Sequence, residues 1–211
     1  MEYFQYFTKS DMELIHEATL HVLETTGVVF GYEPALNLLA KAGCKIDGQR
    51  VFFPPKLVEE QVAKAPSEFT LYARNPEKNV VIGGDNIAFV PCAGPPFVTD
   101  LDRGRRESLL VDYENFVKLA QDSKNIDING GILLEPNDVA YNKRNTQKVY
   151  ASMRYSDKPF MGGCLGAESA RETIDMASIV FGSEKVLAEK PPFISILCSL
   201  SPLSYDDRML S

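Results

Sequence analysis

The sequence predicts an α/β fold: a partial TIM (β/α)8 barrel, preceded by a helical N-terminal region and a small β-rich segment. Three apolar runs carry the prediction, and they begin at Ile126, Pro159 and Phe193, 33 and 34 residues apart. Each interval carries a helical pattern, which favours parallel strands joined by crossover helices. Because a complete barrel needs about 200 to 400 residues, the three units predict the N-terminal portion of a longer enzyme.

Residues 1–65 are expected to form the helical N-terminal region. Helices are predicted over residues 9–27, 33–42 and 56–65, and a hairpin over residues 44–52. Ser10 with Glu13 three residues later is typical of a capping box at the start of a helix. Asp47-Gly48 is a common two-residue hairpin turn, so it sets the tip of the hairpin.

Residues 66–108 are expected to form the β-rich segment, since short β-like runs there alternate with turn clusters. The runs cover residues 69–73, 80–82, 87–90 and 96–100. The densest basic cluster of the chain, Arg103, Arg105 and Arg106, lies beside the turn at Gly104. We interpret this cluster as a solvated hairpin tip rather than a binding patch.

Residues 109–211 are expected to contain the first βα units of the barrel. Helical patterns cover residues 110–122, 138–155 and 168–181, and residues 204–210 resemble the first turns of another helix. Three barrel strands leave unpaired sheet edges, so these residues alone are expected to be inactive as an enzyme.

The composition excludes several classes of function. The formal charge of -7 and pI near 5.0 argue against a nucleic-acid partner, which needs a basic face. No apolar run approaches the roughly 20 residues of a membrane span, and no secretory signal is visible. The four cysteines include no C-x-x-C pair, which favours free thiols in a reducing compartment. We therefore expect a cytoplasmic protein without membrane partners.

In a β/α barrel the active site lies at the carboxyl ends of the strands. Glu135, Gly163, Cys164 and Ser199 follow the three predicted strands and are candidate substrate-binding residues. Glu135 is a candidate base or hydrogen-bond acceptor, or a cap of the next helix. Gly162-Gly163 either admits a ligand or serves close packing. Cys164 has no histidine nearby in sequence, and the predicted strand ends carry no catalytic lysine, metal-ligand motif or dinucleotide fingerprint.

A stiff Gly-Pro-Pro-Phe loop at residues 94–97 holds Phe97 in a defined place. Phe97 either plugs the core or presents its ring to a ligand. Around this loop the chain resembles the trimethylamine methyltransferase family, especially its glycine-betaine-type members that lack pyrrolysine. The resemblance extends over the whole chain and includes FTLYARNP at residues 69–76 and DKPFMGG at residues 157–163. Its other carriers are residues 15–18, 23–28, 51–55, 94–100 and 199–203.

The resemblance implies a TIM-barrel enzyme that moves a methyl group from a methylated amine, a quaternary amine in our interpretation, to a corrinoid (cobalamin). The resemblance also implies that the corrinoid is carried by a partner protein, and we expect these residues to bind none. A quaternary ammonium cannot donate hydrogen bonds and is well held by aromatic faces, so Phe97 is the first candidate, followed by Phe89 and Tyr141. A homo-oligomeric full-length form is expected. A non-catalytic quaternary-amine binding protein and an unrelated TIM-barrel lyase are the alternatives.

Overall fold

Three short parallel strands organise the central part of this computed structural model, which describes residues 5–91, 94–131, 133–163 and 165–211. The strands are β8 (Asn129–Gly130), β9 (Phe160–Met161) and β10 (Phe193–Ile194), in the order β10-β9-β8. Phe160 pairs in parallel with Asn129 on one side and with Phe193 on the other. Each predicted apolar run therefore supplies one strand, and the three are parallel neighbours.

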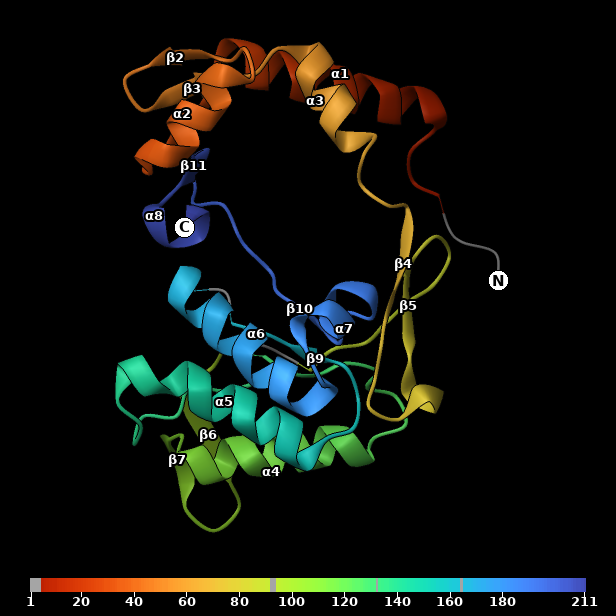
Figure 1. Cartoon of the computed structure of the whole chain (residues 1–211), viewed down its shortest axis with the longest axis vertical. Helices are drawn as coiled ribbons and strands as arrows, with labels where there is room; N and C mark the ends of the chain where they lie inside the picture. The colour runs from red at the N-terminus through yellow and green to blue at the C-terminus, as the bar shows by residue number, and fades with distance from the viewer. Residues whose placement is uncertain (1–4, 92–93, 132, 164) are drawn as a thin grey trace. The chain divides into compact units, whose positions relative to one another are not determined.

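The connections between these strands are helical, as the sequence predicts. α5 (Tyr141–Tyr155) joins β8 to β9, and α6 (Ala167–Phe181) with α7 (Glu184–Glu189) joins β9 to β10. α4 (Leu110–Asp122) precedes β8 and packs against α5, which packs against α6 (Figure 1). None of the sheets formed by the described residues closes on itself. The structure thus establishes a mixed α/β fold, without a closed cylinder.

Two apolar clusters hold these layers together. One joins α4 and α5 to the segment after β8, and the other joins α5, β9, α6 and α7. Their buried members are Tyr113, Val117, Leu133, Leu134 and Ala151 in the first cluster, and Val149, Met153, Phe160, Ala177 and Leu187 in the second. Because α5 contributes to both clusters, its position relative to the strand ends is fixed from two sides.

Two antiparallel hairpins precede α4. β4 (Glu68–Leu71) pairs with β5 (Val80–Gly83) around the short 3-10 helix η1 (Pro76–Lys78), and β6 (Phe97–Asp100) pairs with β7 (Gly104–Glu107). The strand expected over residues 87–90 is not formed, so that prediction is wrong. Phe89 instead forms hydrogen bonds with Asp127 and Ile128. Its N–H donates to Asp127 Oδ2 at 2.8 Å, and its carbonyl accepts from the backbone N–H groups of Asp127 and Ile128.

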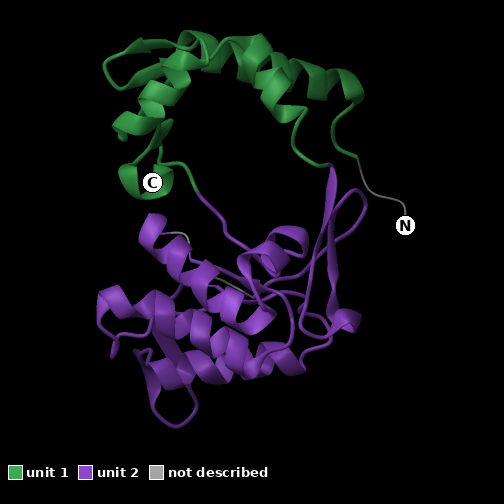
Figure 2. Ribbon diagram, viewed as in Figure 1, with its two compact units in different colours: residues 1–66, 198–211 green, residues 67–197 purple. Residues whose placement is uncertain are grey.

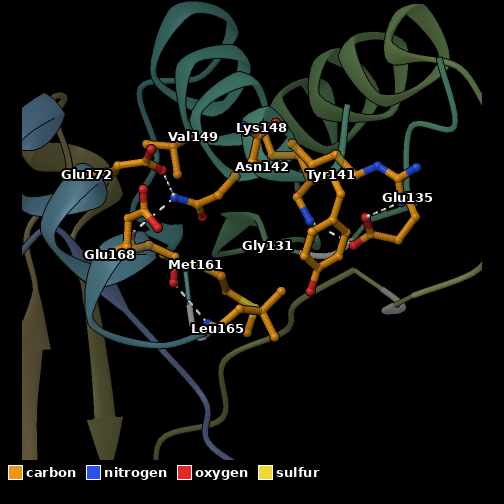
Figure 3. A pocket seen from close by; sticks show the side chains of 15 residues that line it. Gly131, Glu135, Tyr141, Asn142, Lys148, Val149, Met161, Leu165, Glu168 and Glu172 are labelled. Atoms are coloured by element: carbon orange, nitrogen blue, oxygen red, sulfur yellow. Dashed lines mark hydrogen bonds and ion pairs between the residues drawn. The ribbon is translucent and has the colours of Figure 1, made fainter. Parts of the chain in front are cut away.

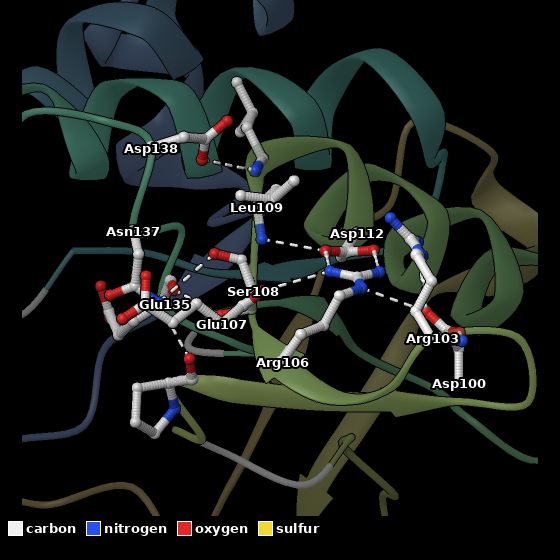
Figure 4. Close-up of polar contacts among 12 residues, drawn as sticks. Asp100, Arg103, Arg106, Glu107, Ser108, Leu109, Asp112, Glu135, Asn137 and Asp138 are labelled. Atoms are coloured by element: carbon white, nitrogen blue, oxygen red, sulfur yellow. Dashed lines mark hydrogen bonds and ion pairs between the residues drawn. The ribbon is translucent and has the colours of Figure 1, made fainter.

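The basic cluster at the β6–β7 turn is more than a solvated tip. The Arg106 side chain is only 18% exposed, and its guanidinium donates to both carboxylate oxygens of Asp112 at 2.6 and 2.7 Å (Figure 4). Its Nε also donates to Asp100 at 3.1 Å. The hydrogen bonds from Arg106 hold the pKa of Asp112 below its ordinary value. The arginine therefore ties the hairpin to the first turn of α4.

The chain divides into two compact units: residues 67–197, described above, and residues 1–66 together with 198–211 (Figure 2). The division expected from the sequence, into 1–65, 66–108 and 109–211, stays a prediction. The elements of the second group are α1 (Lys9–Thr25), β1 (Val28–Phe30), α2 (Glu33–Lys41), β2 (Lys45–Asp47), β3 (Arg50–Phe52), α3 (Pro55–Val62), β11 (Ser204–Tyr205) and α8 (Asp207–Leu210).

Within that unit, β11 pairs in parallel with β1, and the hairpin β2–β3 pairs with its other side. The helices begin and end close to their predicted bounds, but α1 is capped by Thr8 and Asp11 rather than by Ser10 and Glu13. Over the described residues, none of the helices combines the length and the apolar character that a membrane crossing requires. Cys44 and Cys198 are free thiols.

The buried phenol of Tyr113 gives a testable pH dependence. Tyr113 is fully buried, and its hydroxyl donates to the Gly131 carbonyl at 2.9 Å. Burial raises its pKa above the ordinary value of 10.0, so the unfolded chain loses this proton first. The contribution of Tyr113 to the free energy of unfolding should therefore be fully present below about pH 10. Above that pH the free energy of unfolding should fall, by up to about 1.4 kcal/mol per pH unit.

Tyr113→Phe should remove that fall while costing about 1 kcal/mol at neutral pH through the lost hydrogen bond. Urea unfolding of both proteins between about pH 9 and pH 11 measures the difference between their pH dependences. The contributions of the other tyrosines cancel in this difference because both proteins contain them. Equal slopes in the two proteins would contradict the assignment.

Candidate functional site

A pocket of about 170 Å³ lies at the carboxyl ends of β8 and β9 (Figure 3). Its lining comes from the strand ends, from the loop that leads to α5, and from α5 and α6. These residues are Gly131, Glu135, Tyr141, Asn142, Arg144, Asn145, Lys148, Val149, Met161, Gly162, Gly163, Leu165, Glu168, Ser169 and Glu172. This is the sheet edge at which parallel α/β proteins place their ligands.

The face that α5 turns to the pocket carries Tyr141, Arg144 and Lys148, spaced three and four residues apart and therefore on one side of the helix. Glu135 lies against this face: its carboxylate accepts from Lys148 Nζ at 2.7 Å and lies 3.8 Å from Arg144 Nη1. The Lys148 side chain is only 10% exposed. Glu135 is therefore an ion-pair partner of α5 in this structure.

The backbone around Glu135 is fixed by the segment before α4. The buried Ser108 hydroxyl donates to the Glu135 carbonyl at 2.6 Å, and the Glu135 N–H donates to the Pro95 carbonyl at 3.2 Å. Asn137 donates from its side chain to the Pro96 carbonyl at 2.8 Å. The proline-rich loop thus supports the pocket through its backbone.

The face that α6 turns to the pocket is acidic. Glu168 and Glu172 lie one turn apart, and Asn145 of α5 donates to Glu172 at 2.8 Å and to the Ser169 carbonyl at 3.1 Å. Figure 3 shows Glu168 and Glu172 on one side of the pocket and Glu135 on the other. Among the described residues, the Glu168 carboxylate has no hydrogen-bond or ion-pair partner.

Gly163 lets α5 and α6 approach the end of β9. A Cβ on Gly163 would lie 2.3 Å from Asn145 Oδ1 and 2.9 Å from the Ser169 carbonyl, so any side chain here displaces the residue that holds Glu172. The Gly163 N–H donates to Thr173 Oγ1 at 3.1 Å. Glu135 and Gly163, which the sequence nominated separately, line the same pocket. Their role in substrate binding stays a prediction.

The aromatic candidates separate in space. Tyr141 lines the pocket, whereas Phe97 and Phe89 do not. One face of the Phe97 ring already carries a cation, because the Arg105 guanidinium carbon lies 3.8 Å from the ring centroid. Phe97 therefore contacts an arginine of its own hairpin. Ser199 is exposed in the unit that holds the chain ends, and Cys164 lies outside the described residues.

Sequence reasoning missed Arg144, Asn145, Glu168 and Glu172. A signal for them is present in hindsight: each lies in the first two turns of a helix that follows a predicted strand, at three- or four-residue spacing. Within the described part of the chain, no group of three or more histidine, cysteine, aspartate or glutamate side chains could hold a metal ion.

Comparison with known proteins agrees with the resemblance. The model of the trimethylamine methyltransferase (MTTB) family matches residues 1–211. The chain is 48% identical over 203 residues to a glycine betaine methyltransferase of Desulfitobacterium hafniense strain Y51, covering 96% of this chain and 42% of that protein. It is 28% identical over 218 residues to a proline betaine:corrinoid methyltransferase of Eubacterium limosum, covering 99% of this chain and 44% of that protein.

A trimethylamine methyltransferase of Desulfitobacterium hafniense strain DSM 10664 / DCB-2 is 27% identical over 202 residues, covering 93% of this chain and 40% of that protein. The chain thus spans less than half the length of these curated relatives. They are methyltransferases that differ in the amine they use.

Proposed function

This chain belongs to the trimethylamine methyltransferase family, and from that membership we propose that it serves methyl transfer from a methylated amine to a corrinoid protein. We propose a quaternary amine of the betaine type as the methyl donor and the pocket of α5 and α6 as its site. The three parallel strands and the helices that connect them are proposed to be part of a TIM barrel. The cytoplasmic location and the homo-oligomeric form stay predictions.

One observation supports the site above others: a pocket with charged walls lies at the carboxyl edge of the parallel strands. In β/α barrels this edge holds the active site. The 48% identity with a glycine betaine methyltransferase supports a betaine as the donor. Glu135 and Gly163 are retained as proposed site residues because they line this pocket. Phe97 and Ser199 are retained only as predictions from the sequence.

The reaction requires little proton transfer by the protein. A quaternary ammonium leaves as a neutral tertiary amine once a methyl group is removed, so no general acid is needed. The corrinoid, when presented by its partner protein, would supply the nucleophilic cobalt. A cavity of about 170 Å³ is too small to enclose a corrin ring with its side chains, so these residues fit the methyl donor rather than the cofactor.

The work left to the chain is binding and orientation. The Glu168 and Glu172 carboxylates attract a cation to the α6 side. The Tyr141 ring lies on the α5 side, where the Arg144 guanidinium carbon is 6.0 Å from the ring centroid. The partly buried ion pair of Glu135 with Lys148 keeps the side opposite α6 rigid. A donor held between these walls presents its N–CH₃ bond in a fixed direction.

The activity is tested with a chimera in which residues 1–211 replace the matched segment of the Desulfitobacterium hafniense glycine betaine methyltransferase. With cob(I)alamin and glycine betaine, we expect the chimera to form methylcobalamin, and the 211-residue chain alone to form none. The parent enzyme is the positive control. A folded chimera that forms no methylcobalamin with glycine betaine, other betaines, carnitine or trimethylamine would overturn the proposed methyl transfer. Turnover by the chain alone would contradict the proposal that these residues are only part of a barrel.

A further inference from the structure

We propose that the pocket binds a zwitterion in one orientation, with the ligand's carboxylate at Arg144 and its ammonium at Glu168 and Glu172. This inference rests on the proposed function and deepens it, since it assigns the two ends of a betaine to named side chains. It is carried by the opposite charges of the two pocket walls. The basic wall consists of Arg144, Lys148 and Glu135, and the acidic wall of Glu168 and Glu172.

The basic wall leaves one arginine fork available. Lys148 and Glu135 neutralise each other through their 2.7 Å contact. Arg144 Nε donates to the Val139 carbonyl at 3.0 Å, which orients the guanidinium. Its Nη1 lies 3.8 Å from Glu135, beyond hydrogen-bond length, and no other hydrogen bond from its Nη groups is formed within the described residues. Two parallel N–H donors are the arrangement that binds a carboxylate in bidentate fashion.

The acidic wall suits a cation that has no hydrogen to donate. Glu172 is already held by Asn145 at 2.8 Å, so its carboxylate is fixed in direction but keeps its charge. Glu168, one turn earlier on the same face of α6, adds a second negative charge. A trimethylammonium group interacts with such a wall through its charge, because it has no hydrogen to donate.

The two walls together select against simpler ligands. A quaternary amine without a carboxylate leaves the Arg144 donors unused and gains only the acidic wall. A carboxylate without a cation gains only the basic wall and faces two carboxylates on the other side. A betaine interacts with both walls at once, and the charges favour only one orientation of the bound ligand.

The preference is tested by calorimetric titration of the 211-residue chain with three ligands of similar shape. Glycine betaine carries both charges, choline carries the cation with a hydroxyl, and 3,3-dimethylbutanoate replaces the nitrogen by carbon and keeps the carboxylate. We expect glycine betaine to bind at least about 10-fold more tightly than either of the others. Equal affinities, or no binding of glycine betaine, would overturn the proposal.

Substitutions in each wall test which end of the ligand that wall binds. Arg144→Gln should weaken glycine betaine and 3,3-dimethylbutanoate about 10- to 100-fold and leave choline unchanged. Arg144→Lys, which keeps the charge but loses the fork, should give a smaller loss. The double variant Glu168→Gln/Glu172→Gln should weaken glycine betaine and choline but not 3,3-dimethylbutanoate. Loss of all three ligands in Arg144→Gln would show a structural role and contradict the assignment.

Arg171→Gln and Glu184→Gln are the matched charge controls. These residues form an exposed 3.2 Å ion pair outside the pocket. Arg171→Gln changes the net charge as Arg144→Gln does, and Glu184→Gln makes half the charge change of the double glutamate variant. We expect ligand affinities within about 2-fold of the parent chain. The binding result is independent of methyl transfer. If the chimera transfers methyl groups while the ligand preference fails, the zwitterion assignment falls alone; if binding holds without transfer, the proposed function falls.

Discussion

Replacing Lys158 with methionine should destabilise residues 67–197 by about 3 to 5 kcal/mol. The Lys158 ammonium is buried, and it donates to the carbonyls of Ala120, Ser123 and Ile126 at 2.8, 2.6 and 2.6 Å. The first two carbonyls close the carboxyl end of α4, and the third leads into β8. Methionine has a similar length but no donor, so the variant leaves three inward-facing carbonyls without their partner.

The effect is best measured by hydrogen exchange of peptides from α4 and β8, because a chain of two compact units need not unfold in one step. Lys124→Met is the matched control: Lys124 is exposed on the same segment, and its replacement should change stability by no more than about 0.5 kcal/mol. If the α4 and β8 amides are as well protected from exchange in Lys158→Met as in Lys124→Met, Lys158 has no structural role.

The Lys158 contacts also explain why DKPFMGG at residues 157–163 stood out in the sequence. Asp157 accepts from Lys78 at 2.6 Å and from Gln121 at 2.7 Å, so it links the β4–β5 hairpin to α4. The Pro159 carbonyl accepts from Asn129, and Phe160 is the central strand residue. The motif thus joins elements distant in sequence, and its charged residues act mainly in structure.

The sequence was sufficient for the elements whose partners are set by local pattern. The spacing of the three apolar runs predicted parallel neighbours because strands separated by one helix return to the same sheet edge. The hairpin at Asp47-Gly48 and the helix over 110–122 were predicted for equally local reasons, namely turn chemistry and apolar periodicity. The run at 87–90 misled because four successive apolar residues look alike in a strand and in an irregular segment.

What could not be predicted depends on long-range partners. Val29 pairs with Ser204, and no local pattern indicates such a contact. Arg106 looked solvated because its partner, Asp112, lies across the start of the next helix. The walls of the pocket also depend on long-range partners. From the sequence, Arg144 and Glu172 look like ordinary helix-surface charges, and only the packing of α5 against α6 brings them to one pocket. Sequence reasoning found the strand ends and missed the helix faces above them.

Gly130→Ala is the second substitution for which we expect a large loss, about 2 to 5 kcal/mol. Gly130 has φ +73°, where a Cβ costs about 1 to 2 kcal/mol. That Cβ would also lie 2.4 Å from the buried Ser152 hydroxyl oxygen, and overpacking of this kind adds about 1 to 3 kcal/mol. Hydrogen exchange of β8 and α5 peptides measures the loss.

Gly48→Ala separates the two contributions, because Gly48 has φ +58° and no described atom would lie within 4 Å of its Cβ. It should cost only the conformational part, about 1 to 2 kcal/mol. Gly130→Ala/Ser152→Ala should recover the steric part, by about 0.5 to 3 kcal/mol relative to additivity. Ser152 donates to the Lys148 carbonyl at 2.9 Å, so a clash at Gly130 also moves the turn that places Lys148 beside Glu135. If Gly130→Ala costs no more than Gly48→Ala, β8 does not hold α5 in place, and the rigid basic wall loses its support.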